Sequence, residues 1–318
     1  MKRVIIFCFL LYICSSFNVV MGNDSLYKEL QVTLHTATGD LFGTLTEPVQ
    51  KTRMPVALII AGSGPTDRNG NNPMMKNESL HKLAIALADS GIASLRYDKR
   101  AIAESKAAAK SEADLRFDDY VADARDWISL LRKDNRFSRI IVIGHSEGSL
   151  IGMVAAHKNA DAFVSIAGAG RPADKILKEQ LDKQPQAVKD LSFPIIDSLV
   201  AGKTVRTVNP MLFSLFRPSV QPYLISWFKY DPAVEIRKLS IPVLVIQGTN
   251  DIQVSMEDAQ LLAKAGKAPL VAIDHMNHIF RIVEGDRNAN IATYNDPSLP
   301  IAGELSDSIV RFIRKMQP

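Results

Sequence analysis

Residues 140–149 read IIVIGHSEGS, and this stretch decides the fold that we expect for the chain. Its first four positions are all β-branched, which is typical of a strand buried on both faces of a sheet. The pattern G-x-S-x-G follows with Ser146 at its centre, and a helix-like segment begins at Glu147. This is the sequence form of a nucleophile elbow, in which a serine on a sharp turn points its hydroxyl over the sheet. The pattern indicates acyl transfer; the alternative is a turn with an incidental serine.

The N-terminal 22 residues have the composition of a secretory signal peptide. Lys2 and Arg3 precede an apolar run over 4–14, and we expect cleavage after Gly22. A membrane anchor is less consistent with the run, which is shorter than the ~20 residues of a spanning helix. A lipoprotein is disfavoured because Ile13 is too bulky to precede a lipidated cysteine. We therefore expect an exported protein, periplasmic or secreted, without a stable membrane anchor.

Composition narrows the class of protein further. The 318 residues are 47% hydrophobic, enough to bury a large core. Both cysteines, Cys8 and Cys14, lie in the expected signal peptide, so the mature chain would have neither a thiol nor a disulfide, which suits an oxidising compartment. The net charge of the whole chain is only +4, and no run of basic residues forms a patch. No nucleic-acid partner is expected.

Apolar runs and amphipathic segments alternate along the rest of the chain. An antiparallel hairpin is expected over 30–48. Buried strands are expected at 56–61, 92–97, 140–143, 162–166, 243–247 and 270–273, with helices at 78–90, 117–133, 147–157, from Ser255 onward, and at 302–315. This alternation predicts an α/β protein with a mostly parallel central sheet and helices on both faces. Ligands of such proteins bind at the carboxyl ends of the strands.

Residues 171–236 interrupt the alternation. They contain helical stretches and scattered apolar or aromatic residues, but no strand pattern. We interpret this segment as a helical lid inserted into a core formed by 23–170 and 237–318, since lids gate access to a site and exclude water. The alternative is a second packing layer without a part in binding.

A serine nucleophile requires a base, and the base requires a carboxylate that holds its tautomer. With this elbow the order along the chain is serine, acid, histidine. Asp251 follows the buried strand at 243–247 and is our candidate for the acid, although it could simply turn the loop. Glu257 and Asp258 are weaker candidates, because negative charge is favoured in the first turn of the helix where they lie.

Two histidines follow the strand at 270–273, in the sequence DHMNH at 274–278. We prefer His278 as the base, because it stands well past the strand end in a loop that can reach back to the elbow. His275 lies next to the strand and to Asp274, which favours structural hydrogen bonding. A metal site through both histidines lacks an evident third ligand, so neither a metal nor another cofactor is expected.

The tetrahedral intermediate of acyl transfer needs two backbone donors for its oxyanion. The residue after the nucleophile, Glu147, supplies one amide, and a loop after an early strand supplies the other. That loop reads AGSGP at 61–65, and the amide of Ser63 is our candidate, with glycines on both sides that allow close approach. The loop could instead cradle a phosphate, but no phosphate-binding motif follows it.

Several motifs together resemble the α/β-hydrolases, in particular the secreted or periplasmic bacterial carboxylesterases with a helical lid that are grouped with serine aminopeptidase-like hydrolases. The resemblance covers nearly all of the mature chain. Its motifs are GTL at 43–45, GSGPTDRNGN at 62–71, RYDKR at 96–100, the elbow, QGTND at 247–251 and MNH at 276–278. The resemblance implies the α/β-hydrolase fold, with Ser146 as nucleophile, Asp251 as acid and His278 as base.

The chain departs from this family at one place. The family usually has Gly-x-Gly after the RYDKR motif, whereas this chain has Ala101 and Ala103. If those glycines have positive φ, alanine imposes strain or a different loop path. Because the loop lies near the expected site, the departure affects substrate preference more than catalysis.

We therefore expect a serine esterase that cleaves a small-molecule acyl ester through an acyl-enzyme. A peptidase or amidase of the same fold is the main alternative, because one triad cleaves both bonds. A non-catalytic binding protein, or a lipase with an exposed apolar lid face, is also open. The sequence leaves open the acyl and alcohol groups and the oligomeric state.

Overall fold

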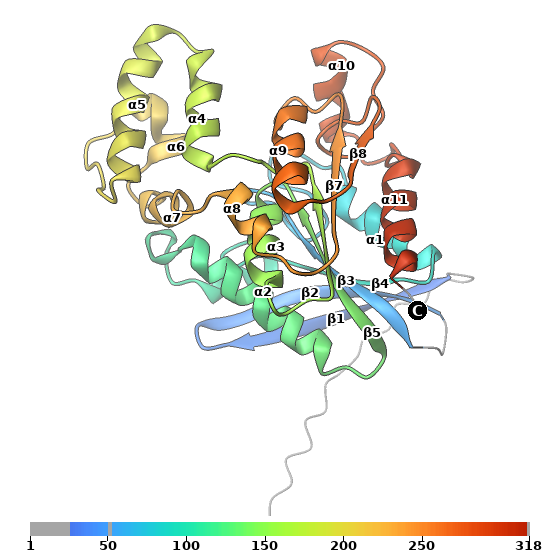
Figure 1. Ribbon diagram of the computed structural model, residues 1–318. Helices are drawn as coiled ribbons and strands as arrows, with labels where there is room; N and C mark the ends of the chain where they lie inside the picture. The colour runs from blue at the N-terminus through green and yellow to red at the C-terminus, as the bar shows by residue number, and fades with distance from the viewer. Residues whose placement is uncertain (1–25, 50–52, 317–318) are drawn as a thin grey trace, which may run out of the picture.

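A computed structural model describes residues 26–49 and 53–316, so the expected signal peptide lies outside the described residues. In this part of the chain one sheet of eight strands has the order β1-β2-β4-β3-β5-β6-β7-β8 (Figure 1). The strands are β1 (Tyr27–Thr36), β2 (Gly39–Pro48), β3 (Met54–Ile60), β4 (Ala93–Tyr97), β5 (Phe137–His145), β6 (Ala162–Ile166), β7 (Val243–Gly248) and β8 (Leu270–Ile273). No helix among the described residues has the length and apolar character needed to cross a membrane.

The sheet is parallel except at its N-terminal edge. Strands β1 and β2 form the expected antiparallel hairpin, and β2 pairs antiparallel with β4. Every other pair of neighbours, from β4 and β3 to β7 and β8, is parallel. The predicted α/β fold with a mostly parallel sheet is therefore confirmed.

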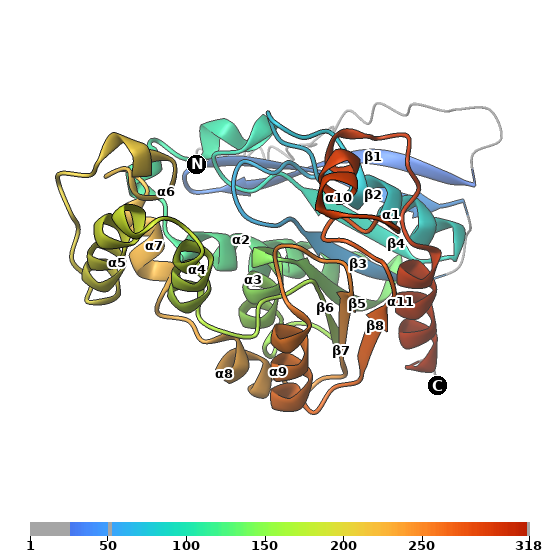
Figure 2. The same ribbon diagram turned by 90° about the horizontal axis from the view of Figure 1, so that it is seen from above.

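The apolar runs form central strands because both faces of the sheet are covered. All seven residues of β3 are buried. Leu58 and Ile60 face one apolar core with helices α2, α3 and α9, whereas Ala57 and Ile59 face the other with α1 and α11. Figure 2 shows these helix groups on opposite sides of the sheet. The five helices are α1 (Ser79–Asp89), α2 (Phe117–Arg132), α3 (Glu147–Ala156), α9 (Met256–Gly266) and α11 (Gly303–Lys315).

Helices alone connect β6 to β7. They are α4 (Ala173–Asp182), α5 (Gln186–Val200), the 3-10 helix η3 (Pro210–Leu212), α6 (Phe213–Phe216), α7 (Gln221–Trp227) and α8 (Pro232–Arg237). We call residues 173–237 the helical insertion. Its apolar side chains form a small core of their own, which includes Ile196, Leu199 and Phe216. Figure 1 shows α4 and α5 standing beside the main body of the protein.

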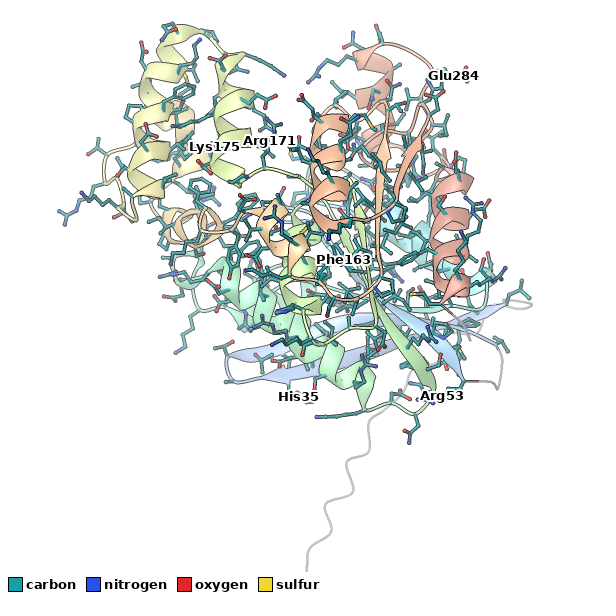
Figure 3. The ribbon with its side chains drawn as sticks, viewed as in Figure 1. His35, Arg53, Phe163, Arg171, Lys175 and Glu284 are labelled. Atoms are coloured by element: carbon teal, nitrogen blue, oxygen red, sulfur yellow. The ribbon has the colours of Figure 1, made fainter. Side chains whose placement is uncertain are left out.

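Specific contacts attach the helical insertion to the rest of the protein. Arg171, two residues before the insertion (Figure 3), donates from Nε and Nη2 to the Asp258 carboxylate of α9, each at 2.9 Å. The rings of Phe117 in α2 and Trp227 in α7 are stacked, with centroids 6.2 Å apart. The main-chain amide of Phe117 also donates to Ser226 Oγ at 2.7 Å. The C-terminal part of the insertion is thus packed directly on α2.

Four short helices in the described part of the chain were not expected from the sequence. They are the 3-10 helices η1 (Ala103–Ala108) and η2 (Glu112–Asp114), and α10 (Arg287–Ala292), which is followed by η4 (Thr293–Asn295). Helix α10 begins where the Asp286 side chain accepts from the amides of Asn288 and Ala289. Only three of its six residues are apolar, so it is too short to show the apolar periodicity that marks a longer helix.

Candidate active site

Ser146 lies on a strained turn between β5 and α3. Its φ of 55° and ψ of −120° are unusual for a residue with a side chain, and its amide donates to the Ile166 carbonyl at 3.0 Å. A Cβ on Gly144 would lie 2.3 Å from the Gly148 carbonyl oxygen, and one on Gly148 would lie 2.3 Å from the Ile60 carbonyl oxygen. Both glycines of the G-x-S-x-G pattern are therefore required by close packing of the turn.

His278 and Asp251 form a buried pair in the loops after β8 and β7. His278 Nδ1 lies 2.8 Å from Asp251 Oδ2, with side-chain exposures of 5% and 1%. Asp251 Oδ1 accepts from the amides of Gln253 and Val254 at 2.7 and 3.0 Å. Because the carboxylate holds the Nδ1 proton, Nε2 of a neutral His278 is free to accept one.

Two opposing effects act on the Asp251 carboxyl. Burial alone would raise the pKa of Asp251, because the charged form loses hydration. The charge and hydrogen bond of His278, together with the amides of Gln253 and Val254, outweigh burial and lower this pKa below its ordinary value. Gln247 Nε2 adds a donor to Asp251 Oδ2 at 3.1 Å. Asp251 therefore remains a carboxylate in the pH range where a histidine acts as a base.

His145 joins the elbow to the loop that carries His278. His145 Nε2 donates to the His278 carbonyl oxygen at 2.9 Å, and the two rings are 4.8 Å apart. Burial and the neighbouring His278 lower the pKa of His145 to about 3, so its ring is neutral. Since His145 directly precedes Ser146, this contact holds His278 beside the elbow. His275 is placed differently: its side chain is half exposed next to Asp274.

The two predicted oxyanion donors lie close to Ser146. Glu147 follows the serine, and a Cβ on Gly62 would lie 3.2 Å from Ser146 Cβ, so the 61–65 loop touches the elbow. In the described part of the chain, neither the Ser63 amide nor the Glu147 amide has a hydrogen-bond acceptor. Two main-chain donors are therefore available next to the serine, as an oxyanion requires.

Ser146, Ser63 and Glu147 open into a cavity of about 850 Å³. The helical insertion supplies much of its apolar wall, and the segment with η1 and η2 supplies another side. The insertion residues are Ala173, Ile176, Leu177, Gln180, Ser214, Leu215, Arg217, Val220, Tyr223, Leu224, Trp227, Phe228 and Pro232. This volume suits a small molecule, with apolar walls and few polar groups at the reacting end.

A buried ion pair at this site was not predicted from the sequence. Lys99 Nζ lies 3.0 Å from Glu147 Oε2 and 2.5 Å from the Gly62 carbonyl oxygen. Tyr223 of the helical insertion donates to Glu147 Oε1 at 2.6 Å. Lys99 belongs to the RYDKR motif, which carried only the family resemblance. Its place two residues after the end of a buried strand was the signal that could have found it.

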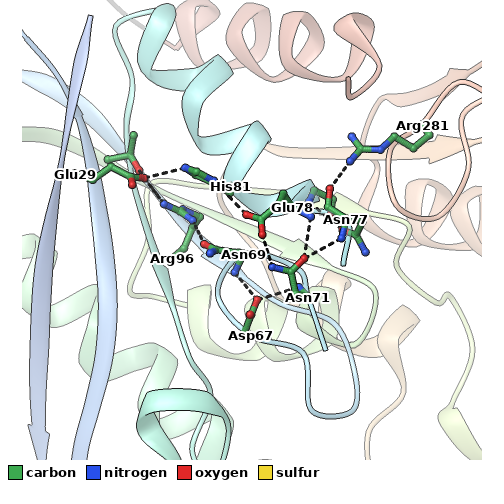
Figure 4. A network of polar contacts seen from close by, with 11 residues as sticks. Glu29, Asp67, Asn69, Asn71, Asn77, Glu78, His81, Arg96 and Arg281 are labelled. Atoms are coloured by element: carbon green, nitrogen blue, oxygen red, sulfur yellow. Dashed lines mark hydrogen bonds and ion pairs between the residues drawn. The ribbon is translucent and has the colours of Figure 1, made fainter. Parts of the chain in front are cut away.

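A polar network holds the loop between β3 and α1 (Figure 4). Asp67 Oδ1 accepts from the amides of Asn69 and Asn71 at 2.8 and 2.9 Å, and Asn71 Oδ1 accepts from the Glu78 amide at 2.9 Å. Asn69 also accepts from the buried Arg96 of β4. These contacts explain the GSGPTDRNGN motif, because each one fixes the loop that presents Ser63.

No metal centre is formed by the described residues: they contain no group of three or more His, Cys, Asp or Glu side chains that could hold a metal ion. His278 points to Asp251, and His275 lies apart from it. The two histidines are therefore not arranged as a pair of ligands.

Comparisons with known proteins find similarity to hydrolases. A hydrolase family described as serine aminopeptidase, S33, matches residues 76–214. Esterase EstD of Thermotoga maritima is 26% identical over 277 residues, which are 81% of this chain and 61% of that protein. The chain thus spans about three fifths of the length of this curated relative.

Solved structures show the same fold at low sequence identity. Est1E from Butyrivibrio proteoclasticus has a TM-score of 0.58 at 15% identity, covering 89% of this chain and 99% of that one. Esterase Pf2001 of Pyrococcus furiosus has a TM-score of 0.59 at 16% identity, covering 93% and 96%. The chain has the α/β-hydrolase fold and belongs to the α/β-hydrolase superfamily.

Proposed function

We propose that this protein is a serine carboxylic-ester hydrolase that cleaves small acyl esters through an acyl-enzyme. Ser146 is the nucleophile, His278 the base and Asp251 the acid. The observation that carries the proposal is the buried His278–Asp251 pair, which His145 holds beside a strained serine at the cavity. The esterase names of the Thermotoga relative and the Pyrococcus structure support the same activity.

The proposed reaction has two halves. As Ser146 Oγ attacks the ester carbonyl carbon, His278 Nε2 takes the hydroxyl proton, and the oxyanion accepts from the Ser63 and Glu147 amides. The carbon–oxygen bond to the alcohol then breaks, and His278 gives its proton to the departing oxygen. Water repeats these steps on the acyl-enzyme, which releases the carboxylic acid and restores Ser146.

The first test is ester turnover by the wild type and by Ser146→Ala. We expect the wild type to hydrolyse p-nitrophenyl acetate and butyrate, and Ser146→Ala to fall by about 10³-fold or more. A fluorophosphonate should label the wild type and Ser306→Ala, whose serine is half-buried on α11 away from the cavity, but not Ser146→Ala. A folded wild type that neither turns over these esters nor takes the label would refute the proposal.

A serine aminopeptidase is the second candidate, because the matching family at 76–214 carries that description. An aminopeptidase binds a substrate ammonium group, which requires a free carboxylate in the pocket. The acidic residues of the cavity wall, Glu112 and Glu147, are paired with Arg217 and Lys99. This charge arrangement favours the ester. Comparing leucine p-nitroanilide with p-nitrophenyl butyrate decides between them, since an aminopeptidase must cleave the anilide.

We also propose that the protein is exported after removal of residues 1–22. The basic start, the apolar run and the small-residue exit of the sequence support this. N-terminal sequencing of the protein from the periplasm or medium of an expressing bacterium should begin at Asn23. Recovery only from the cytoplasm with residues 1–22 intact would contradict it.

A further inference from the structure

We propose that Lys99 is a positioning residue that orients both oxyanion donors, and that Tyr223 links the Lys99–Glu147 pair to the helical insertion. The proposal rests on the proposed function, because it concerns the oxyanion site at Ser63 and Glu147. Lys99 is not in the predicted triad and does not need to contact the substrate. Its role follows from the two groups that its ammonium binds.

The first group is the Gly62 carbonyl oxygen, 2.5 Å from Lys99 Nζ. This carbonyl and the Ser63 amide belong to one peptide group. The described residues contain no cis peptide bond, so the C=O and N–H of this planar group point in opposite directions. By holding the carbonyl, Lys99 fixes the direction of the Ser63 N–H. The charge of Lys99 also polarises the peptide and strengthens that donor.

The second group is the Glu147 carboxylate, 3.0 Å from Lys99 Nζ. The Glu147 amide is the other proposed oxyanion donor, so one lysine contacts the peptide group that carries one donor and the side chain of the residue that carries the other. The glycines on either side of Ser63 let its loop adopt other paths. The ammonium group removes that freedom by joining the loop to the elbow.

The surroundings of the pair make these contacts strong. The side-chain exposures of Lys99 and Glu147 are 1% and 3%. The Tyr120 ring, whose centroid is 5.1 Å from Nζ, contacts the same ammonium. A buried ion pair adds little net stability compared with well-packed apolar residues, because both charges lose hydration. Stability therefore does not explain this pair, whereas the placement of the two amides does.

Tyr223 connects the Lys99–Glu147 pair to the helical insertion. Its hydroxyl donates to Glu147 Oε1 at 2.6 Å, and Lys99 binds the other carboxylate oxygen. Tyr223 lies in α7 and also lines the cavity. A movement of α7 would break this bond and release one side of the carboxylate. The position of the insertion and the geometry of the oxyanion site are therefore coupled.

The test begins with Tyr223→Phe, which removes one hydroxyl and keeps the ring. We expect kcat for p-nitrophenyl butyrate to fall roughly tenfold, with a much smaller change in KM. The hydrogen bond that is lost goes to the charged Glu147 carboxylate, which supports the oxyanion site. The affinity for butylboronic acid, which forms a tetrahedral adduct with the serine, should fall in parallel. Tyr230→Phe is the matched control, since its hydroxyl donates to Asp118 at 2.5 Å, away from the site. Equal kcat and boronate affinity in the two variants would overturn the link.

The lysine is tested by Lys99→Met and by Lys99→Met/Glu147→Gln. The single variant leaves Glu147 buried without its cation and can fail to fold, whereas the double variant removes both charges. We expect the folded double variant to lose about 10²-fold in kcat and in boronate affinity, with Lys99→Arg recovering part of both. Wild-type kcat in the double variant would overturn the proposal. Absence of wild-type activity refutes the proposed function instead, which separates the two failures.

Discussion

The backbone is left-handed at Ala101 and Ala103, with φ of 70° and 42°. These are the positions where the family resemblance led us to expect glycine. Alanine in this region places its Cβ too close to the following carbonyl, at a cost of about 1–2 kcal/mol. Ala101 lines the cavity, so the strain lies at the edge of the candidate site.

Ala101→Gly and Ala103→Gly should therefore stabilise the protein. Glycine makes the unfolded chain more flexible, which lowers the free energy of unfolding by ~0.4–1 kcal/mol. Relief of the left-handed strain outweighs this loss, so we expect each variant to gain about 0.5–1 kcal/mol in the free energy of unfolding. The control is Ala107→Gly in η1, where φ is not positive and glycine should destabilise. Urea unfolding measures all three. If Ala101→Gly lowers the free energy of unfolding as much as Ala107→Gly does, the backbone at Ala101 is not strained.

Arg96 joins three neighbouring strands. This buried residue of β4 lies 2.5 Å from Glu29 Oε1 in β1 and donates to Thr46 Oγ1 in β2 at 3.2 Å (Figure 4). Burial would raise the pKa of Glu29. The hydrogen bond and charge of His81, the Arg96 charge and the Thr46 hydrogen bond together lower it to about 2.

The Arg96–Glu29 ion pair should make the protein less stable as the pH falls. Because the folded-state pKa of Glu29 is lowered, its contribution is complete above its unfolded pKa of about 4.3 and is lost as pH falls toward 2. Glu29→Gln should cost about 1–2 kcal/mol at pH 7, discounted for the partly exposed carboxylate. Urea unfolding of both proteins at several pH values should show this difference shrinking below about pH 4.3. A difference that stays constant down to pH 2 would contradict the lowered pKa.

The elements best predicted from the sequence are those whose pattern is set by burial. The run at 140–143 is a strand of the sheet because both its faces are covered, and α10 was missed because the Asp286 side chain, not an apolar face, starts it. The meeting of Asp251 and His278 followed from the ends of two adjacent parallel strands. The contact of Lys99 with Gly62 did not, because the partner of a long side chain depends on how three separate loops pack.

The charges around the cavity are unevenly balanced. Glu147 pairs with Lys99, Glu112 with Arg217, and Arg171 with Asp258. Lys106 and Lys110 also line the cavity, and neither has an acidic partner among the described residues. Both lie in the segment around η1, on the same side as the strained Ala101. The walls of the cavity are apolar, but their unpaired charge is positive.

A substrate with an anionic group away from its ester bond should therefore be preferred over a neutral one of the same length. We compare p-nitrophenyl hemiadipate with p-nitrophenyl hexanoate for the acyl side, and p-acetoxybenzoate with its methyl ester for the alcohol side. In one of these pairs, kcat/KM should favour the anion by roughly fivefold, which corresponds to about 1 kcal/mol for an exposed charge pair. Added salt should reduce the preference, because it screens exposed charges.

Replacing the unpaired lysines tests the cause of this preference. Lys106→Gln/Lys110→Gln should bring the ratio of the anionic to the neutral substrate close to one, because the cavity loses both unpaired cations. Lys133→Gln is the control for net charge, since Lys133 is exposed at the end of α2 and does not line the cavity. If the ratio is the same in the double variant and in the control, the two lysines do not select the substrate. If neither pair of esters shows a preference in the wild type, the apolar walls alone decide which esters enter.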